Sequence, residues 1–216
     1  MYTPLAASHA KRREADQHRQ WLNNFEQALV QHKTEGGCME LPVAIRVAVP
    51  SDAQALADLH MRSAREGFTD IFPAEQLARS HHQELASDWL ARLQPDLPLG
   101  QIALVAEVDG IVVGVLLAGP DAPGAAVGRL SRLYVDPRLW GQGVRRRLLN
   151  AGVAHLRDIG CMVATAWIME RNHQARALAQ HLGWTCTGER QPTCEKSASM
   201  PAGVYDVGYQ LLLASE

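Results

Sequence analysis

A strand, a turn that contains two glycines, and a helix follow one another in the middle of this chain. The β-type run at residues 129–135 ends before Pro137, and proline bars further strand pairing. Beyond Gly141 and Gly143, apolar residues recur about one helical turn apart through residues 144–159. Glycines let a ligand approach the backbone, and the first amides of a helix lack intrahelical partners and favour negative charge. The stretch therefore predicts a binding site for a ligand that carries phosphate.

The spacing within this loop narrows the class of phosphate ligand. The loop lacks the Gly-Lys-Ser/Thr ending of a P-loop, and Arg146 stands where the dinucleotide fingerprint has its third glycine. What is present is Arg-x-x-Gly-x-Gly, from Arg138 to Gly143, directly after a strand. This pattern resembles the acyl-CoA signature of the GCN5-related N-acetyltransferases (the GNAT family), usually written Gln/Arg-x-x-Gly-x-Gly/Ala. The resemblance implies acetyl-CoA as the cosubstrate.

The composition argues against several other classes of protein. The 216 residues are 47% apolar and 20% charged, which is typical of one soluble globular domain with or without an appendage. A net charge of −2 provides no attraction to nucleic acid, and Glu107 and Asp109 interrupt the most apolar stretch, so we expect no membrane span. The N-terminus lacks the apolar core of a secretory signal, and the four cysteines form no Cys-x-x-Cys pair, which fits a reducing compartment. No His/Cys cluster has the spacing of metal ligands. We therefore expect a cytoplasmic protein without a metal site.

Residues 1–40 are expected to form a helical N-terminal extension. The apolar residues between Trp21 and Leu29 fall on one helical face, and this pattern stops at Gly36. The extension could pack on the domain or on a neighbouring molecule, serve as a partner-binding arm, or be dispensable for folding.

The domain itself is expected to span residues 43–213. Asp109 and Gly110 predict a two-residue type I′ turn between the second and third strands, and Asn172 is expected to cap the last helix. Strands are predicted at residues 43–48, 102–108, 111–117, 129–135, 162–168, 184–188 and 204–213, and helices at residues 51–66, 73–93, 144–159 and 172–182.

The resulting order, β-α-α-β-β-β-α-β-α-β-β, resembles the whole GNAT acyltransferase fold, an α/β fold with a mixed sheet. Two local patterns add to the resemblance. Asn172-x-x-Ala175 and the helix end Leu182-Gly183-Trp184 are similar to the Asn-x-x-Ala…Gly-Phe segment of the family.

The resemblance also implies where the cosubstrate binds. In the family the fourth and fifth strands splay apart and the pantetheine arm lies in the gap, where the Val135 N–H is expected to polarise the thioester carbonyl. The loop at residues 138–145 is expected to wrap the pyrophosphate, although at most one or two of the arginines at 145–147 can reach CoA phosphates. The expected cofactor-binding residues are Leu133, Tyr134, Val135, Arg138, Leu139, Trp140, Gly141, Gln142, Gly143, Val144, Arg145 and Asn172.

The general base and general acid of the family pattern are missing here. Many relatives carry a carboxylate or histidine on the fourth strand, facing the same way as Leu133 and Val135, where this chain is expected to place Arg129 and Ser131. The tyrosine that many relatives place six or seven residues after the asparagine is replaced by Leu178 or Ala179.

Only weak replacement candidates for acid and base can be named, and these are Glu66, Asp70, Glu170 and His173.

The leading interpretation is an N-acetyltransferase in which a primary amine of a small molecule or peptide attacks acetyl-CoA directly in a ternary complex. The alternative is a catalytically silent CoA-binding or regulatory module. We expect neither nucleic-acid nor membrane partners, and a homodimer is possible, as in many relatives. The acceptor would be chosen by the loops at residues 67–72 and 189–203.

Overall fold

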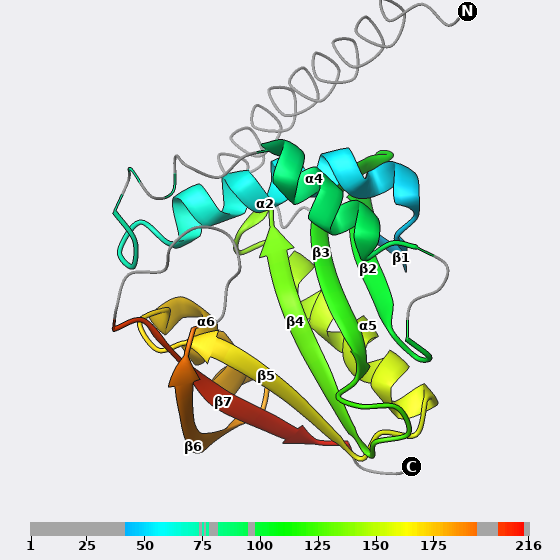
Figure 1. Ribbon diagram of the computed structural model, residues 1–216, viewed down its shortest axis with the longest axis vertical. Coiled ribbons are helices and arrows are strands. Elements are labelled where there is room, and N and C mark those ends of the chain that lie inside the picture. Colours follow the sequence, from blue (N-terminus) through cyan, green and yellow to red (C-terminus); the bar gives the residue numbers. More distant parts are fainter. Residues whose placement is uncertain are drawn as a thin grey trace, which may run out of the picture. The chain divides into compact units, whose positions relative to one another are not determined.

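The computed structural model describes residues 42–73, 75, 77, 82–94, 98–193 and 203–213 (Figure 1). The chain divides into two compact units, Met1–Pro42 and Val43–Glu216, and the second unit is described below. The expected extension at residues 1–40 lies outside the described residues. So do much of the first half of the helix expected at 73–93, most of the loop at 189–203, and Cys38 and Cys194.

A seven-stranded sheet forms the centre of the second unit, in the order β1-β2-β3-β4-β5-β7-β6. All neighbouring strands are antiparallel except β4 and β5, which are parallel. The strands are β1 (Ala44–Val47), β2 (Ile102–Val108), β3 (Ile111–Pro120), β4 (Val127–Val135), β5 (Val163–Met169), β6 (Thr185–Pro192) and β7 (Tyr205–Leu212).

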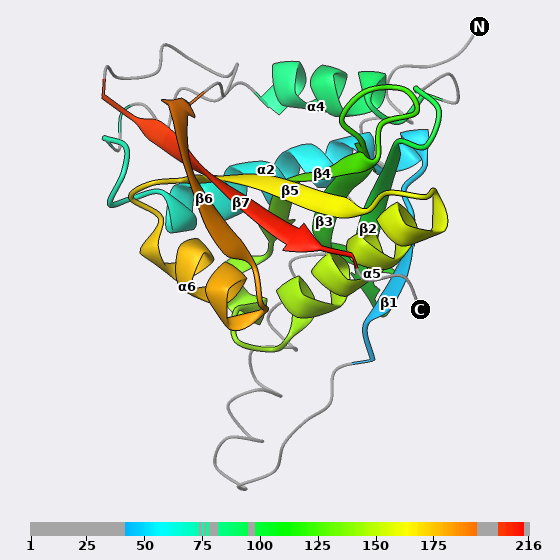
Figure 2. The ribbon, with the colours of Figure 1, turned by 90° about the horizontal axis from the view of Figure 1, so that it is seen from below.

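Helices cover both faces of this sheet. Helices α2 (Ala53–Gly67) and α4 (His82–Ala91) lie on one face, and α5 (Val144–Asp158) and α6 (His173–His181) lie on the other (Figure 2). The mixed α/β class and the order of elements are therefore as expected from the sequence. Among the described residues, every helix falls short of the length and apolar character that crossing a bilayer requires.

The two faces are packed differently. On the α2 and α4 face, fully buried residues such as Leu56 and Trp89 pack against Val105 and Val115 of the sheet. On the other face α5 lies very close to the strands, because a Cβ atom on Gly128 would stand only 2.5 Å from a Leu156 methyl group. Gly152 of α5 allows the same close approach, with a hypothetical Cβ 2.6 Å from Leu116. Small residues on both surfaces therefore fix α5, and the loop before it, against β3 and β4.

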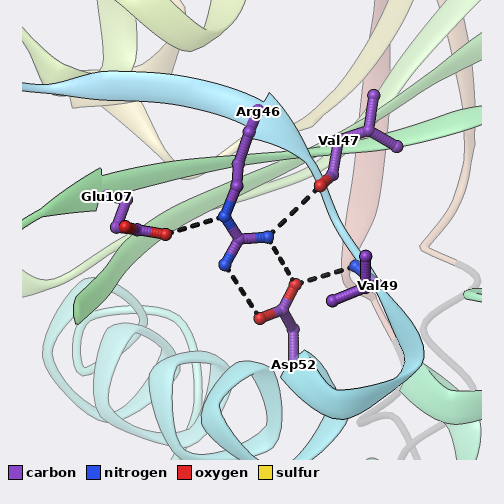
Figure 3. Close-up of polar contacts among 5 residues, drawn as sticks. All are labelled: Arg46, Val47, Val49, Asp52 and Glu107. Atoms are coloured by element: carbon purple, nitrogen blue, oxygen red, sulfur yellow. Dashed lines mark hydrogen bonds and ion pairs between the residues drawn. The ribbon is translucent and has the colours of Figure 1, made fainter. Parts of the chain in front are cut away.

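Arg46 joins three elements at the edge of the sheet (Figure 3). From β1, its Nε donates to Glu107 of β2 at 2.7 Å, and its Nη1 and Nη2 donate to the Asp52 carboxylate at 2.8 and 3.0 Å. The Val49 N–H also donates to Asp52, at 2.8 Å. Burial alone would raise the pKa of Asp52, but the hydrogen bonds from Arg46 and Val49 outweigh it and hold that pKa below its ordinary value. The carboxylate therefore stays charged and fixes the start of α2 against β1.

β4 and β5 pair over only part of their length. The parallel register runs from Val127–Leu130 against Val163–Ala166, and beyond it the strands diverge (Figure 1). The register of β4 on β3 shifts at the same level, where Arg132 takes a positive φ of 52°. This shift is a bulge, which adds one residue to β4 and bends it. The gap that the family resemblance implied is therefore present.

The bulge corrects one expectation about β4. Arg129 and Ser131 were expected to face the same way as Leu133 and Val135, on strict alternation. The register places Ser131 opposite Leu117 and Tyr134 opposite Val115, so Ser131 shares its face with Tyr134 rather than with Val135. That prediction was wrong because one extra residue reverses the alternation beyond it.

Local sequence signals were sufficient at the turn between β2 and β3 but not within β6. Asp109 and Gly110 have φ values of 50° and 78°, which confirms the type I′ turn between β2 and β3. In contrast, β6 was expected to end at Gly188 but continues to Pro192. A shift in register against β7 between Cys186 and Arg190 absorbs Gly188, which has a φ of 79°. Gly188 therefore marks an irregularity within the strand rather than its end.

Candidate active site

A cavity of about 400 Å³ lies where β4 and β5 part. Its walls come from the end of α2, the facing edges of β4 and β5, α6, and the adjoining ends of β6 and β7. Because α2 and α6 lie on opposite faces of the sheet and both contribute to the lining, the cavity is lined from both faces.

The glycine loop follows β4 on the α5 side. Gly141 and Gly143 have φ values of 82° and 78°, and a Cβ atom on either would meet no atom of the described residues within 4 Å. The left-handed conformation thus requires glycine, while the space beside the backbone is open. The first α-helical bond beyond the loop runs from the Arg147 N–H to the Gly143 carbonyl at 3.0 Å, so the preceding amides belong to the unbonded first turn. This geometry suits an anionic ligand such as a diphosphate.

A buried carboxylate holds the start of the loop in place. Asp136 is fully buried, and its side chain accepts hydrogen bonds from the Arg138 N–H and from Arg62 Nε of α2, both at 3.2 Å. Its own N–H donates to the Val113 carbonyl of β3 at 2.9 Å. The loop is therefore tied both to the sheet and to a helix on the opposite face.

Arg145 supplies positive charge beside the glycine loop. Its guanidinium lies over the Trp140 ring, 4.7 Å from the centroid, and burial lowers its pKa. Among the described residues no acidic side chain forms an ion pair with it. Trp140 is held in turn, because its Nε1 donates to the Val135 carbonyl at 2.9 Å. A desolvated cation without an anionic partner in the described chain is suited to bind an anion. Arg146, one residue further, is exposed.

The backbone of Val135 faces the gap between the strands. Successive N–H groups of a strand point to opposite edges. The next N–H, that of Asp136, donates toward β3, so the Val135 N–H points toward β5. β4 has no pairing with β5 at this level. The group expected to polarise the thioester therefore stands on the open edge of the strand.

The other predicted cofactor residues fall into three groups. The backbone N–H groups of Arg138 and Gln142 donate within the loop, to the Asp136 side chain and to the Leu139 carbonyl, both at 3.2 Å. Leu133, Tyr134, Trp140, Arg145 and Asn172 line the cavity. Asn172 also accepts a hydrogen bond from the Ala175 N–H at 3.0 Å, which confirms it as the cap of α6. The Leu139 and Val144 side chains are buried in the core, so these two residues can offer a ligand only their backbone. The Tyr134 ring is also buried, stacked on His60 with centroids 4.0 Å apart.

The four weak candidates for acid and base lie elsewhere. Glu66 and Asp70 are exposed near the end of α2, and His173 is exposed at the start of α6. Glu170 forms an ion pair with Arg190 at 2.8 Å, and this hydrogen bond lowers the pKa of its carboxyl group. The described lining of the cavity includes none of the four, although their neighbours Gly67 and Asn172 contribute to it.

Sequence reasoning missed one acidic residue that does line the cavity. Asp206, near the start of β7, accepts a hydrogen bond from Thr193 Oγ1 at 2.7 Å, and Thr193 and Gln191 line the same wall. No local pattern marks Asp206, because its position in the site depends on β7 pairing between β5 and β6. Only the register of those strands could have identified it.

Comparison with known proteins agrees with this geometry. The family model for the acetyltransferase (GNAT) family matches residues 54–184. A mycothiol acetyltransferase of Propionibacterium freudenreichii is 25% identical over 165 residues, which cover 70% of this chain but only 53% of that relative. The chain thus spans about half the length of this relative.

Two solved structures share the fold over nearly their whole length. The PaiA N-acetyltransferase of Thermoplasma acidophilum, in complex with coenzyme A, superposes with a TM-score of 0.62 at 15% identity, covering 80% of this chain and 99% of that one. YncA of Salmonella typhimurium, with its cofactor acetyl-CoA, gives a TM-score of 0.58 at 24% identity, covering 81% and 95%. With a family model matched over more than half of its residues, the chain belongs to the GNAT family of acetyltransferases.

Proposed function

We propose that this protein is an acetyl-CoA-dependent N-acetyltransferase that acetylates a primary amine of a small molecule or peptide by direct attack in a ternary complex. One observation carries the proposal. The cavity is lined from both faces of the sheet, with Arg145, which follows the glycine loop, and Leu149 of α5 on one side and the end of α2 on the other. Two reactants can therefore meet in the gap between β4 and β5 without a covalent intermediate on the protein.

The chain's own groups have distinct roles in this proposal. The amides of the glycine loop and Arg145 bind the diphosphate of the cosubstrate, and the Asn172 side chain lies beside the pantetheine arm. The Val135 N–H donates to the thioester oxygen, which becomes more negative as the carbonyl is attacked.

The reaction balances without any additional reactant. The acceptor ammonium releases a proton, and its nitrogen lone pair then forms a bond to the acetyl carbon. The bond from that carbon to sulfur breaks, and the sulfur leaves as a thiolate that takes up a proton. A second proton leaves the acetylated nitrogen, which gives an amide and free coenzyme A.

The proposal is tested by measuring free thiol released from acetyl-CoA over a panel of primary amines, with the same protein examined by calorimetry for coenzyme A binding. Amine-dependent thiol release supports the proposal. Coenzyme A binding without thiol release for any amine would contradict it and favour the silent binding module. That alternative has one observation in its support, since Leu178 lines the cavity where many relatives place a tyrosine.

A further inference from the structure

Asp206 lies on the side of the sheet from which the acceptor would approach. It stands directly opposite Met169 in the β5–β7 register, and residues opposite each other on antiparallel strands share a face. Met169 packs against Ile71 and Phe72, which follow α2 in the chain. Tyr209 lies three residues after Asp206 on β7, so its side chain points to the other face of the sheet. There it accepts a hydrogen bond from Arg176 of α6 at 3.1 Å. Asp206 therefore faces the α2 side, across the sheet from α6.

The charges around the cavity are unequally distributed. Of the described residues in its lining, Asp206 is the only acid. Two of the lining arginines already have acidic neighbours, because Arg129 pairs with Asp121 at 2.6 Å and Arg132 lies 3.6 Å from Asp88. Arg145 stands at the glycine loop. One carboxylate thus serves the α2 side of the cavity, where the acceptor would approach.

Apolar side chains border this carboxylate on the β5 side, and Gln191 stands opposite it on β6. Phe68 and Met169 line the cavity beside it and belong to the same packed cluster, and Trp167 lines the adjoining part of β5. Thr193 fixes the carboxylate through its hydrogen bond. A cation on an apolar stem is complementary to this surface, whereas a second cationic group would find no acidic partner in the described lining.

We propose that Asp206 binds the ammonium group of the acceptor and that the acceptor is a monoamine carried on a short apolar or aromatic stem. This inference rests on the proposed function, because it assigns the acceptor half of the same cavity. The Asp206 carboxylate places the nitrogen on the α2 side of the gap, opposite the cosubstrate.

The test uses the full chain loaded with coenzyme A and three probes, namely 2-phenylethylamine, its neutral analogue 2-phenylethanol, and the polycation spermidine. Calorimetry gives the Kd of each, and thiol release from acetyl-CoA gives kcat and KM for the amines. We expect the wild type to bind 2-phenylethylamine at least tenfold more tightly than the other two, because a charge-assisted hydrogen bond is lost with the alcohol. Asp206→Asn should abolish this preference and raise KM about tenfold while the Kd for coenzyme A is unchanged.

Asp206→Asn keeps an oxygen that can accept the Thr193 hydrogen bond, so folding is preserved. Glu189→Gln is the matched control, because Glu189 is an exposed acid on β6 whose side chain lies beside Gly208, on the same face of the sheet. The control should behave as the wild type does.

Three results would overturn the inference: no amine binding to the loaded wild type at millimolar concentration, unchanged amine affinity in Asp206→Asn, or tighter binding of spermidine. Thiol release that does not depend on Asp206 would overturn the inference while leaving the proposed function intact. Amine binding that depends on Asp206 but gives no thiol release would support this site and contradict acetyl transfer instead.

Discussion

Arg46 and Arg145 are both partly buried arginines, but their surroundings differ in kind. Arg46 donates to two carboxylates, and the hydrogen bond to Asp52, above all, raises its pKa (Figure 3). Arg145 lies over an aromatic ring, and burial lowers its pKa because no acid of the described chain offsets the loss of water. The guanidinium of the first arginine holds β1, β2 and the start of α2 together. In our proposal the charge of the second binds a ligand, and its burial lowers the stability of the folded chain.

The largest effect is expected when negative charge is introduced into the glycine loop. Gly143→Glu places a carboxylate where a diphosphate would bind, in a backbone conformation that costs a non-glycine residue about 1–2 kcal/mol. We expect calorimetry to show at least a hundredfold loss of coenzyme A affinity in a chain that remains folded by circular dichroism.

Gly160→Glu is the matched control for this variant. Gly160 also has a positive φ, of 84°, and a Cβ there would meet no atom of the described chain within 4 Å, but it follows the opposite end of α5. The control should bear a similar backbone cost and bind coenzyme A normally. Equal affinities in the two variants would remove the assignment of the glycine loop.

Removing the Arg46 side chain should act on stability alone. Arg46→Met leaves Asp52 buried without its main partner, and we expect a loss of about 2–3 kcal/mol in the free energy of unfolding, measured with urea. The affinity for coenzyme A should not change. Arg92→Met is the comparison, because its partner Asp88 is 39% exposed whereas Asp52 is 10% exposed, and this variant should lose under about 1 kcal/mol. Similar losses in the two variants would show that the Arg46 contacts are no more than surface pairs.

Removing the Arg145 side chain should weaken coenzyme A binding and leave stability nearly unchanged, which is the reverse of the result expected for Arg46→Met. We expect Arg145→Met to weaken coenzyme A binding about tenfold, and the affinity should depend less on salt than it does in the wild type. The Tm of the ligand-free protein should stay within a few degrees of the wild-type value, because an unfavourably buried charge is removed along with its contact to Trp140. Arg146→Met, at an exposed position, should leave affinity and salt dependence as they are. A marked fall in the Tm of Arg145→Met would make Arg145 structural.

The smallest effect is expected from lowering the pH, which weakens the contribution of the Asp52 carboxylate to stability. Because the pKa of Asp52 is lower in the folded chain than the unfolded value of about 3.9, its contribution is complete above that value and is lost as the pH falls through the folded pKa. Asp52→Asn should therefore be less stable than the wild type at pH 7, and the difference should shrink toward pH 3. Thermal unfolding across this range measures it. A difference that stays constant with pH would mean that the charge of Asp52 does not stabilise the fold.

The parts of the site that sequence could predict are those built from neighbouring residues. Gly141, Gly143 and the Asn172 cap were recognisable because turns and helix ends impose local demands on residue type. The bulge at Arg132 was not recognisable, since an arginine gives no signal of a positive φ and the shift exists only relative to β3. Asp206 was missed for a related reason, because its neighbours in space come from strands paired across the sheet.

Because of the bulge at Arg132, the cavity between β4 and β5 depends on the number of residues in β4. One residue more or fewer in the turn between β3 and β4 would be absorbed at the surface. Removing the extra residue of β4, in contrast, would straighten the strand. It would then pair with β5 along more of its length, which would close the cavity between them. It would also swap inward and outward side chains over the last stretch of the strand, up to Val135. A single-residue deletion there would therefore erase the reaction chamber while leaving the sequence of the phosphate loop intact.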